Sequence, residues 1–327
     1  MLATSRMWRT EPAVWDTQRG KRTLRKGRFE ANLEKEGDVG KQEEQAARLV
    51  WQYGEPIHAV LFFAPETRAA TDGLGLKGGW MSYFGCRAAP LGTVPAAVVT
   101  SIFYGFHPRR VERAIPDAWA YAEPRQLIDA RLSAMDAALG RLLGEAIDGP
   151  DVRRAASLAT AAVHSADFSG RPLGAANAAL ADPGAPHLQL WQALGAMREH
   201  RGDGHVTCLV ANQVDPCESL VMQAATGRSE RESLRANRGW SDEEWRTAVM
   251  HLREREWLDD NERPTPSGTK ARDAIEAATD RLAAPLVATL GARAVELVEA
   301  MRPLAERIMA AGEVPKLNNM GLPWPSQ

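Results

Sequence analysis

Residues 241–268, SDEEWRTAVMHLREREWLDDNERPTPSG, contain the stretch of sequence that decides the fold. The serine that opens it is a strong N-cap, and the three acidic residues after it suit the positive end of a helix dipole. Trp245, Val249 and Leu252 then recur at spacings of four and three, which places them on one helix face. The stretch therefore predicts an amphipathic helix over residues 241–256.

A hairpin and a second helix are predicted directly after this helix. Two short strands are expected near residues 257–266, joined by a tight turn at 259–261, and a long helix is expected over 269–290. Helix, hairpin and long helix in this order are typical of a winged helix-turn-helix. Residues 241–256 would then occupy the recognition position, next to a short wing.

The same pattern recurs earlier in the chain, which indicates an internal duplication. Residues 128–144 (IDARLSAMDAALGRLLG) and 275–291 (IEAATDRLAAPLVATLG) have equal length, share apolar positions and end in glycine, as helices often do. Other matching segments keep the same order, including the helices expected after His107 and after Trp240. The sequence predicts a mainly α fold of two tandem winged-helix-like repeats, a pseudo-two-fold helical protein with short β-wings.

Three parts are expected along the chain. Residues 1–46 carry six basic residues between Arg19 and Arg28 and are interpreted as a basic, flexible N-terminal arm, with a solvated tail as the alternative. Residues 47–187 would form the first, aromatic-rich repeat, and residues 188–327 the second. Because two repeats in one chain resemble a symmetric dimer, the alternatives are a pseudo-dimeric monomer and a homodimer.

Composition narrows the class of protein. The 327 residues are 44% apolar and 25% charged with a formal charge of -2, which is typical of a globular chain without an overall field for polyanions. Three cysteines without a CxxC pair favour neither a disulfide framework nor a zinc site. No apolar run is long enough for a bilayer, so we expect a cytoplasmic protein without membrane contact. No metal or cofactor motif is present.

Several segments resemble known regulators. The Thr-Pro-x-Gly turn at 265–268 is similar to the turn that often ends the wing in MarR-type regulators, and most of residues 47–327 resembles a bacterial helix-turn-helix family often labelled MarR-like. The matching segments are EPIH (55–58), FAPE (63–66), RAAPLG (87–92), HRGDGH (200–205), GWSDEEW (239–245) and MGLPWP (320–325). The resemblance implies a winged-helix fold and a role in transcription regulation, with no established reaction.

The charge of the predicted recognition helix does not suit DNA. Residues 241–256 contain five acidic and three basic side chains, whereas DNA-binding segments usually carry an excess of cations. The helix expected after His107 is more basic. DNA and a small-molecule ligand therefore remain the two alternative partners. The candidate DNA contacts are Arg109, Arg110, Arg246, Arg253 and Arg263.

Aromatic residues point to a small-molecule site in the first repeat. Twelve of the 21 aromatic residues lie between Trp51 and Tyr121, whereas the matching stretch of the second repeat has four. Repeats with equal packing duties need similar numbers, so the surplus favours an enclosed ligand. An aromatic core, or a surface that packs on the other repeat, is the alternative.

Polar residues accompany that surplus. His58 is suited to proton exchange near neutral pH, Arg87 to holding a carboxylate, and Glu66 to orienting either one. Residues 200–205 are expected to interrupt a helix, so that their histidines and aspartate converge as ligand or catalytic contacts. A metal site and a structural turn are the alternatives. The predicted ligand-binding residues are His58, Phe63, Glu66, Trp80, Tyr83, Phe84, Arg87, Tyr104, His107, His200, Asp203 and His205.

Two hypotheses of function follow. The first is a ligand-responsive MarR-like regulator that binds a small molecule in an aromatic pocket. The second is an enzyme or small-molecule-binding protein that uses its winged helices only as a scaffold, with a site between the repeats.

Overall fold

The computed structural model describes residues 26–322 of the chain, with side chains described for residues 40–322. The chain divides into two compact units, Met1–Val39 and Gly40–Gln327. The account below concerns the second unit.

The predicted N-terminal arm falls mainly on the first unit. Residues 1–25, which hold most of its basic side chains, lie outside the described residues, and residues 26–46 belong to helix α1 (Lys26–Phe63). A flexible arm therefore stays a prediction for residues 1–25.

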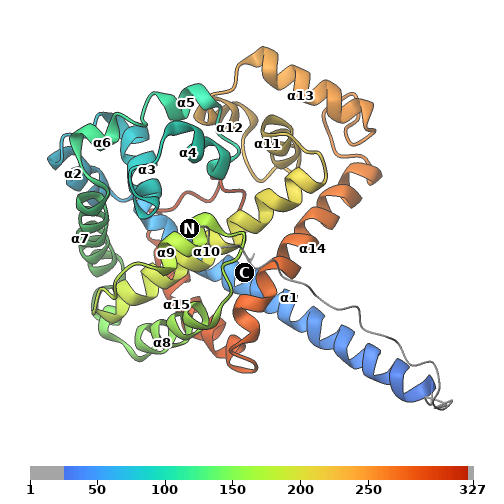
Figure 1. Ribbon diagram of the computed structural model, residues 1–327, viewed down its shortest axis with the longest axis horizontal. Coiled ribbons are helices and arrows are strands. Elements are labelled where there is room, and N and C mark those ends of the chain that lie inside the picture. Colours follow the sequence, from blue (N-terminus) through green and yellow to red (C-terminus); the bar gives the residue numbers. More distant parts are fainter. Residues whose placement is uncertain (1–25, 323–327) are drawn as a thin grey trace, which may run out of the picture. The chain divides into compact units, whose positions relative to one another are not determined.

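The described chain is a succession of helices (Figure 1). Many begin with proline in the first turn, where the missing N–H is not needed and φ is already helical. After α1 follow α2 (Pro65–Gly73), α3 (Gly78–Ala88), η1 (Ala89–Leu91), α4 (Ala96–Phe103), α5 (Pro108–Glu112), α6 (Ala118–Tyr121), α7 (Pro124–Leu143), η2 (Gly144–Asp148), α8 (Pro150–Ser165) and α9 (Pro172–Ala178). The second half contains α10 (Pro186–Ala211), α11 (Pro216–Ala225), α12 (Arg231–Arg238), α13 (Asp242–Glu254), α14 (Pro266–Ala288) and α15 (Arg293–Ala310).

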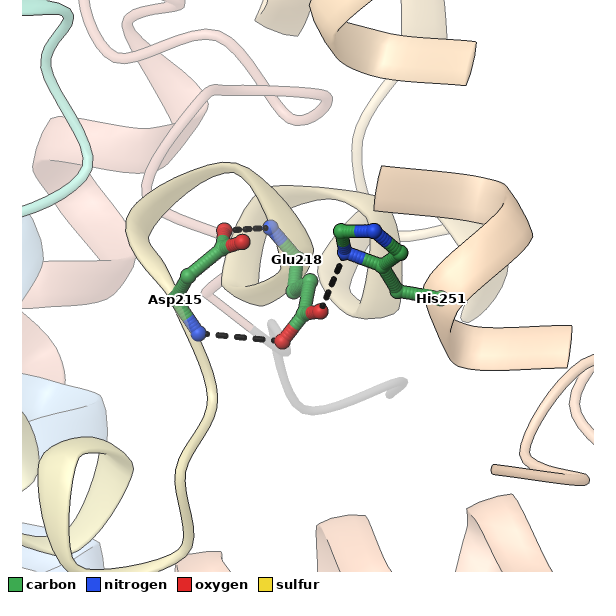
Figure 2. Close-up of side chains that lie close together, drawn as sticks. All are labelled: Asp215, Glu218 and His251. Carbon is green, nitrogen blue, oxygen red and sulfur yellow. Dashed lines mark hydrogen bonds and ion pairs between the residues drawn. The ribbon is translucent and has the colours of Figure 1, made fainter. Parts of the chain in front are cut away.

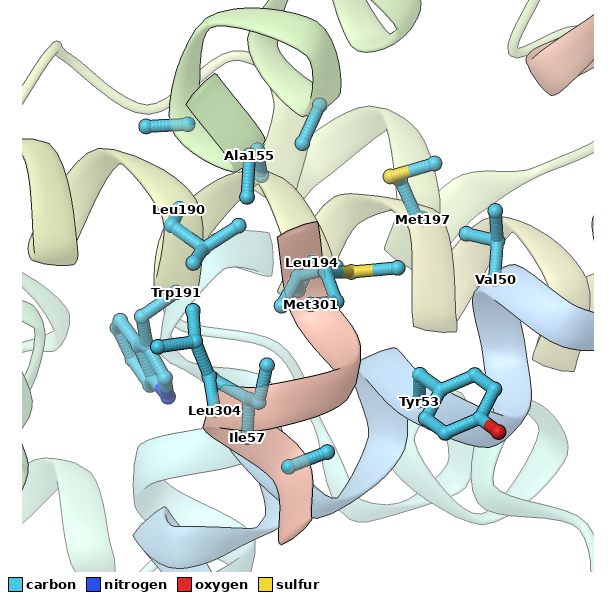
Figure 3. Close-up of a cluster of buried hydrophobic side chains, with 14 of the residues drawn as sticks. Val50, Tyr53, Ile57, Ala155, Leu190, Trp191, Leu194, Met197, Met301 and Leu304 are labelled. Carbon is cyan, nitrogen blue, oxygen red and sulfur yellow. The ribbon is translucent and has the colours of Figure 1, made fainter. Parts of the chain in front are cut away.

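The largest hydrophobic core lies around α10, which packs against α8, α9 and α14. Trp191 and Leu194 of α10 lie close to Ile57 of α1 and Leu304 of α15 (Figure 3). Trp191 is 1% exposed. Burial of a large side chain of this kind contributes about 1.5–3 kcal/mol to folding, so this core fixes the helices that carry the residues of the candidate site.

Two smaller cores flank the largest one. The first lies around Phe84 of α3 and Phe106, and the second around Trp245 of α13 and Leu234 of α12. The second core joins α11, α12 and α13 into a three-helix group (Figure 1). Such a group, with a three-residue connection between α12 and α13, has the form of a helix-turn-helix.

The predicted mainly α fold is confirmed, but the predicted β-wings are wrong. Residues 26–322 contain no strand, and residues 257–266 form only an isolated bridge between Leu258 and Pro264. Pro264 and Pro266 lack the N–H groups that a ladder needs. The Asp259 carboxylate accepts hydrogen bonds from the N–H groups of Asn261 and Arg263, which closes a tight turn. Two backbone hydrogen bonds cross beside the bridge, from Asp259 to Arg263 and from Thr265 to Trp257, and no strand extends from them.

The two helices predicted around that turn are confirmed. Ser241 caps α13 and forms a capping box with Glu244. Thr265 accepts a hydrogen bond from the Gly268 N–H and so caps α14. A Cβ atom at Gly268 would lie 2.0 Å from the Trp257 carbonyl oxygen. The Thr-Pro-x-Gly segment is thus a helix start that passes close to the preceding turn.

The predicted interruption at residues 200–205 is also wrong. Helix α10 continues through this segment. Its glycines permit close packing instead of a break, because a Cβ atom at Gly204 would lie 2.0 Å from Nη1 of Arg171. The three polar side chains do not converge at a break, because each has its own partner, as described below.

Candidate functional site

A cavity of about 780 Å³ lies between helices from both halves of the chain. Its lining residues come from α1, α3 and α4, from α10, α11, α12 and α14, and from residues 315–321 near the C-terminus. Cavities of this volume hold drug-sized ligands. The cavity is therefore the candidate functional site.

Helix α3 supplies an aromatic wall. Trp80, Tyr83 and Arg87 follow one another at spacings of three and four, so they share the helix face that lines the cavity. The Tyr83 ring centroid lies 5.8 Å from that of Trp80 and 5.4 Å from that of Phe106. The Arg87 guanidinium lies over the Phe103 ring, 4.0 Å from its centroid. The Arg110 guanidinium lies over the Trp80 ring, 4.9 Å from its centroid. The wall is therefore aromatic, with guanidiniums stacked on its rings.

Glu199 of α10 is the centre of a buried ion network. Its two carboxylate oxygens accept hydrogen bonds from Nε and Nη2 of Arg87 at 2.9 and 2.8 Å. Arg198 donates to Glu199 at 2.6 Å and to Glu55 of α1 at 2.9 Å. Burial alone would raise the pKa of Glu199, but the guanidiniums of Arg87 and Arg198 lower it to about 2. Glu199 is therefore ionised at neutral pH.

The Tyr83 phenol lies in a positive field. Its oxygen accepts a hydrogen bond from Nη1 of Arg87 at 3.2 Å. Burial raises the pKa of Tyr83, but the charges of Arg87, Arg238 and Arg198 outweigh this effect, so the pKa lies below its ordinary value. The lowered pKa of Tyr83 thus indicates an excess of positive charge in this part of the cavity.

Arg238, the last residue of α12, contributes part of that charge. Its guanidinium lies over the Phe106 ring, 4.2 Å from the centroid, and Nη2 donates to the Asn319 carbonyl oxygen at 2.9 Å. Its Nε is buried and has no hydrogen-bond partner. No carboxylate oxygen of residues 40–322 lies within 4.0 Å of its nitrogens. Burial lowers the pKa of Arg238, as expected for a cation without a countercharge.

A second polar group lies on the α14 side of the cavity. Nη2 of Arg201 is 2.9 Å from Oδ1 of Asp280 and 3.5 Å from Oε2 of Glu276. Its guanidinium lies over the Trp51 ring, 4.7 Å from the centroid, and its Nη1 is buried without a partner. This group offers a second site for an acceptor atom.

The turn between α12 and α13 packs on the turn between α4 and α5. The His107 N–H donates to the Arg238 carbonyl oxygen at 2.9 Å, and the Trp240 indole donates to the Gly105 carbonyl oxygen at 3.0 Å. Nε2 of His107 also lies 2.9 Å from Oε1 of Glu244, in the first turn of α13. The start of α13 is thus held by residues of the first half.

A helix-turn-helix family matches residues 47–315 of the chain. The chain belongs to this family. Comparisons with curated proteins and with solved structures give no match. Membership of the helix-turn-helix family indicates a DNA-binding regulator in general; it does not specify the MarR type or a winged helix.

Seven predicted ligand-binding residues of this helix-turn-helix protein line the cavity: Phe63, Trp80, Tyr83, Arg87, Tyr104, Asp203 and His205. Most already have partners. Arg87 is paired with Glu199, and the Tyr104 hydroxyl donates to the Val214 carbonyl oxygen at 2.6 Å. Asp203 accepts hydrogen bonds from the Leu173 and Gly174 N–H groups, and burial raises its pKa to about 6. Nδ1 of His205 lies 2.9 Å from the Thr279 hydroxyl.

Two of the predicted residues outside the cavity, His58 and His200, are buried histidines. His58 stacks on Trp191, with ring centroids 5.2 Å apart. Burial, reinforced by Arg198, lowers its pKa to about 3. Nε2 of His200 faces the Asp167 carbonyl oxygen at 3.3 Å, and burial lowers its pKa to about 4. Both are neutral core histidines at pH 7.

Three further predicted residues also lie outside the cavity. Glu66 pairs with Arg141 through hydrogen bonds of 2.7 and 2.9 Å. Phe84 is fully buried in the core behind the aromatic wall. His107 caps α5 and contacts the start of α13.

The predicted DNA contacts divide into two groups. Arg110 donates to the Ala236 carbonyl oxygen, and Arg253 donates to the Asp259 and Asp260 carbonyl oxygens. The exposed guanidiniums of Arg109, Arg246 and Arg263 have no hydrogen-bond or ion-pair partner within residues 40–322. The second group is thus available for a phosphate.

The sequence analysis missed the ion network and Arg238. Glu55 lies between Trp51 and His58 on the buried face of α1, and a charge on such a face signals a buried partner. A buried partner for Glu55 could therefore have been predicted from the sequence. The environment of Arg238 could not be predicted, because it is formed by Phe106 and Asn319, which are distant in the sequence.

Asp215, Glu218 and His251 form a cluster with the donor types of a metal site (Figure 2). Asp215 and Glu218 exchange hydrogen bonds as the capping box of α11, at 2.7 and 3.0 Å. Arg255 also lies 3.7 Å from Glu218, which supplies a cation to the same carboxylate. Helix capping accounts for the two carboxylates, and Nδ1 of His251 lies 3.4 Å from Oε1 of Glu218.

Within residues 26–322, no single helix is long and apolar enough to cross a membrane. One pair of segments, Gly78–Leu91 and Ala96–Phe103, meets the length and composition criteria only when taken together, across a bend of 93°.

Proposed function

We propose that this helix-turn-helix protein is a ligand-responsive regulator that binds a small, partly apolar molecule in its cavity. The observation that carries the proposal is the cavity of about 780 Å³, which has an aromatic wall on α3 and residues of α12 among its lining. A ligand there contacts the helix-turn-helix itself. The alternative, a small-molecule-binding protein that uses these helices as a scaffold, requires the same site, so ligand binding is tested first.

Filling the cavity is expected to abolish binding of an apolar probe. Val206 on α10 lines the cavity, whereas Val210, one turn further along, is 58% exposed and does not. Val206→Trp places an indole in the cavity, so the affinity for N-phenyl-1-naphthylamine should fall about tenfold or more, which corresponds to about 1.4 kcal/mol. Fluorescence titration of the full chain measures this. Val210→Trp is the matched control, and equal affinity in the two variants would contradict a site in the cavity.

DNA binding is the second candidate function, and family membership favours it. The exposed Arg246 on α13 is the cation best placed on a helix-turn-helix surface. A random duplex should be retarded at about 50 mM salt and released steeply as salt rises, and Arg246→Ala should reduce the salt slope by about one. Arg125→Ala on α7 is the control. A duplex that stays unretarded at low salt would leave only the scaffold alternative.

The tandem repeats over 47–187 and 188–327 remain part of the proposal, without the wings that the structure excludes. Helices α7 and α14, which carry the similar 17-residue segments, are both followed by a glycine with φ of 54°, Gly144 and Gly291. A MarR-like affiliation and a cytoplasmic location are also predictions that these observations leave unchanged.

A further inference from the structure

The part of the cavity around Tyr83 has more positive than negative groups. Three guanidiniums, those of Arg87, Arg198 and Arg238, act on the Tyr83 phenol. Two buried carboxylates, Glu55 and Glu199, are paired with the first two of these cations. The third cation has no carboxylate partner within residues 40–322.

The unpaired cation is Arg238. Its Nη2 donates to the Asn319 carbonyl oxygen and its guanidinium also interacts with the Tyr83 phenol, but its buried Nε has no acceptor and no carboxylate of residues 40–322 pairs with it. A buried donor without an acceptor destabilises the fold, and more so when it is charged. A ligand with an acceptor atom at this end of the cavity would satisfy the free Nε of Arg238.

We propose that the ligand of this cavity is an organic monoanion with a flat apolar body, and that its acid group pairs with Arg238. The inference rests on the proposed function, since it assigns a ligand class to the same site. One buried guanidinium without a carboxylate partner suits a single negative charge at this end of the cavity, and its planar fork suits a carboxylate or sulfonate. The aromatic wall of Trp80, Tyr83 and Phe106 accepts the flat body.

Other groups at the site support one anion and not a strongly charged one. The carboxylates of Glu199 and Glu55 form ion pairs at this end of the cavity and would repel a second negative charge. Arg87 is held by Glu199 through two hydrogen bonds, so it is not free for a ligand. On the α14 side, the buried Nη1 of Arg201 offers a donor for a neutral acceptor at the other end of the ligand.

Two probes of equal shape test the inference. The first is 8-anilinonaphthalene-1-sulfonate, a monoanion, and the second is N-phenyl-1-naphthylamine, which has the same rings without the sulfonate. Fluorescence titrations of the full chain at neutral pH should show that the anion binds about tenfold more tightly than the neutral probe. Arg238→Gln should remove that preference and leave the affinity for the neutral probe unchanged.

Two further variants make the test specific. Arg231→Gln on the same helix changes a partly exposed arginine outside the cavity and should keep the preference. Arg238→Lys retains the charge and should keep most of it, which a purely structural role of the Arg238 fork would not predict. A preference that does not follow the charge at position 238 overturns the inference. If neither probe binds in a way that Val206→Trp blocks, the proposed function itself fails, which is a different result.

Discussion

Replacing Glu199 with glutamine is expected to lower the free energy of unfolding by about 3–5 kcal/mol. Glu199 is 3% exposed and bonds to both Arg87 and Arg198. The substitution leaves Arg87 without a carboxylate partner, because Glu55 pairs only with Arg198. A buried charge that loses its partner retains its desolvation cost, and this accounts for the size of the effect. Urea unfolding at pH 7 measures it.

The control for this variant is Glu254→Gln on the surface of α13. Glu254 is exposed and forms no ion pair within the described part of the chain, so its replacement should change the unfolding free energy by less than about 0.5 kcal/mol. A loss below about 1 kcal/mol for Glu199→Gln would show that the network does not stabilise the fold.

Acidification below pH 6.5 is expected to destabilise the protein through His58. Its pKa is about 3 in the folded protein, against 6.5 for an ordinary histidine. As the pH falls, the unfolded chain binds this proton first, so stability is lost progressively between pH 6.5 and about pH 3. The linkage slope is about 1.4 kcal/mol per pH unit, which amounts to about 3 kcal/mol at pH 4.5.

The variant His58→Phe isolates this contribution. Phenylalanine keeps a ring against Trp191, where the His58 ring now stacks, but it cannot bind a proton. The variant should lose about 3 kcal/mol less than the wild type between pH 6.5 and 4.5. The exposed His164 provides a control, since His164→Gln should follow the wild-type profile. Identical pH profiles for His58→Phe and wild type would refute the assignment.

Local signals in the sequence were sufficient for the helices. The N-cap at Ser241, the acidic first turn and the spacing of Trp245 and Val249 act within α13, and the structure has that helix. The β-wing was predicted from the order of elements, although Pro264 and Pro266 within it argue against a ladder. The glycines at 202 and 204 indicated a break because the close approach of Arg171 to Gly204 was not visible in the sequence.

For the candidate site, the aromatic surplus pointed to α3, but Phe84, predicted beside Trp80 and Tyr83, lies in the core, and the charges opposite α3 were not predicted. Trp80, Tyr83 and Arg87 line the cavity. The partner of Arg87 is Glu199, which lies 112 residues further along the chain. Pairings of that range depend on how helices pack, and they leave no periodic trace in a single sequence.

Arg238 takes part in two contacts described separately above. Its guanidinium faces the cavity, while its carbonyl oxygen accepts the His107 N–H in the contact between the two turns. The side chain of Arg238 thus contacts the cavity, and its main chain contacts the interface between the α12–α13 turn and the α4–α5 turn. A displacement of Arg238 on ligand binding would weaken or strengthen the contact between these two turns directly, because the same residue makes both contacts.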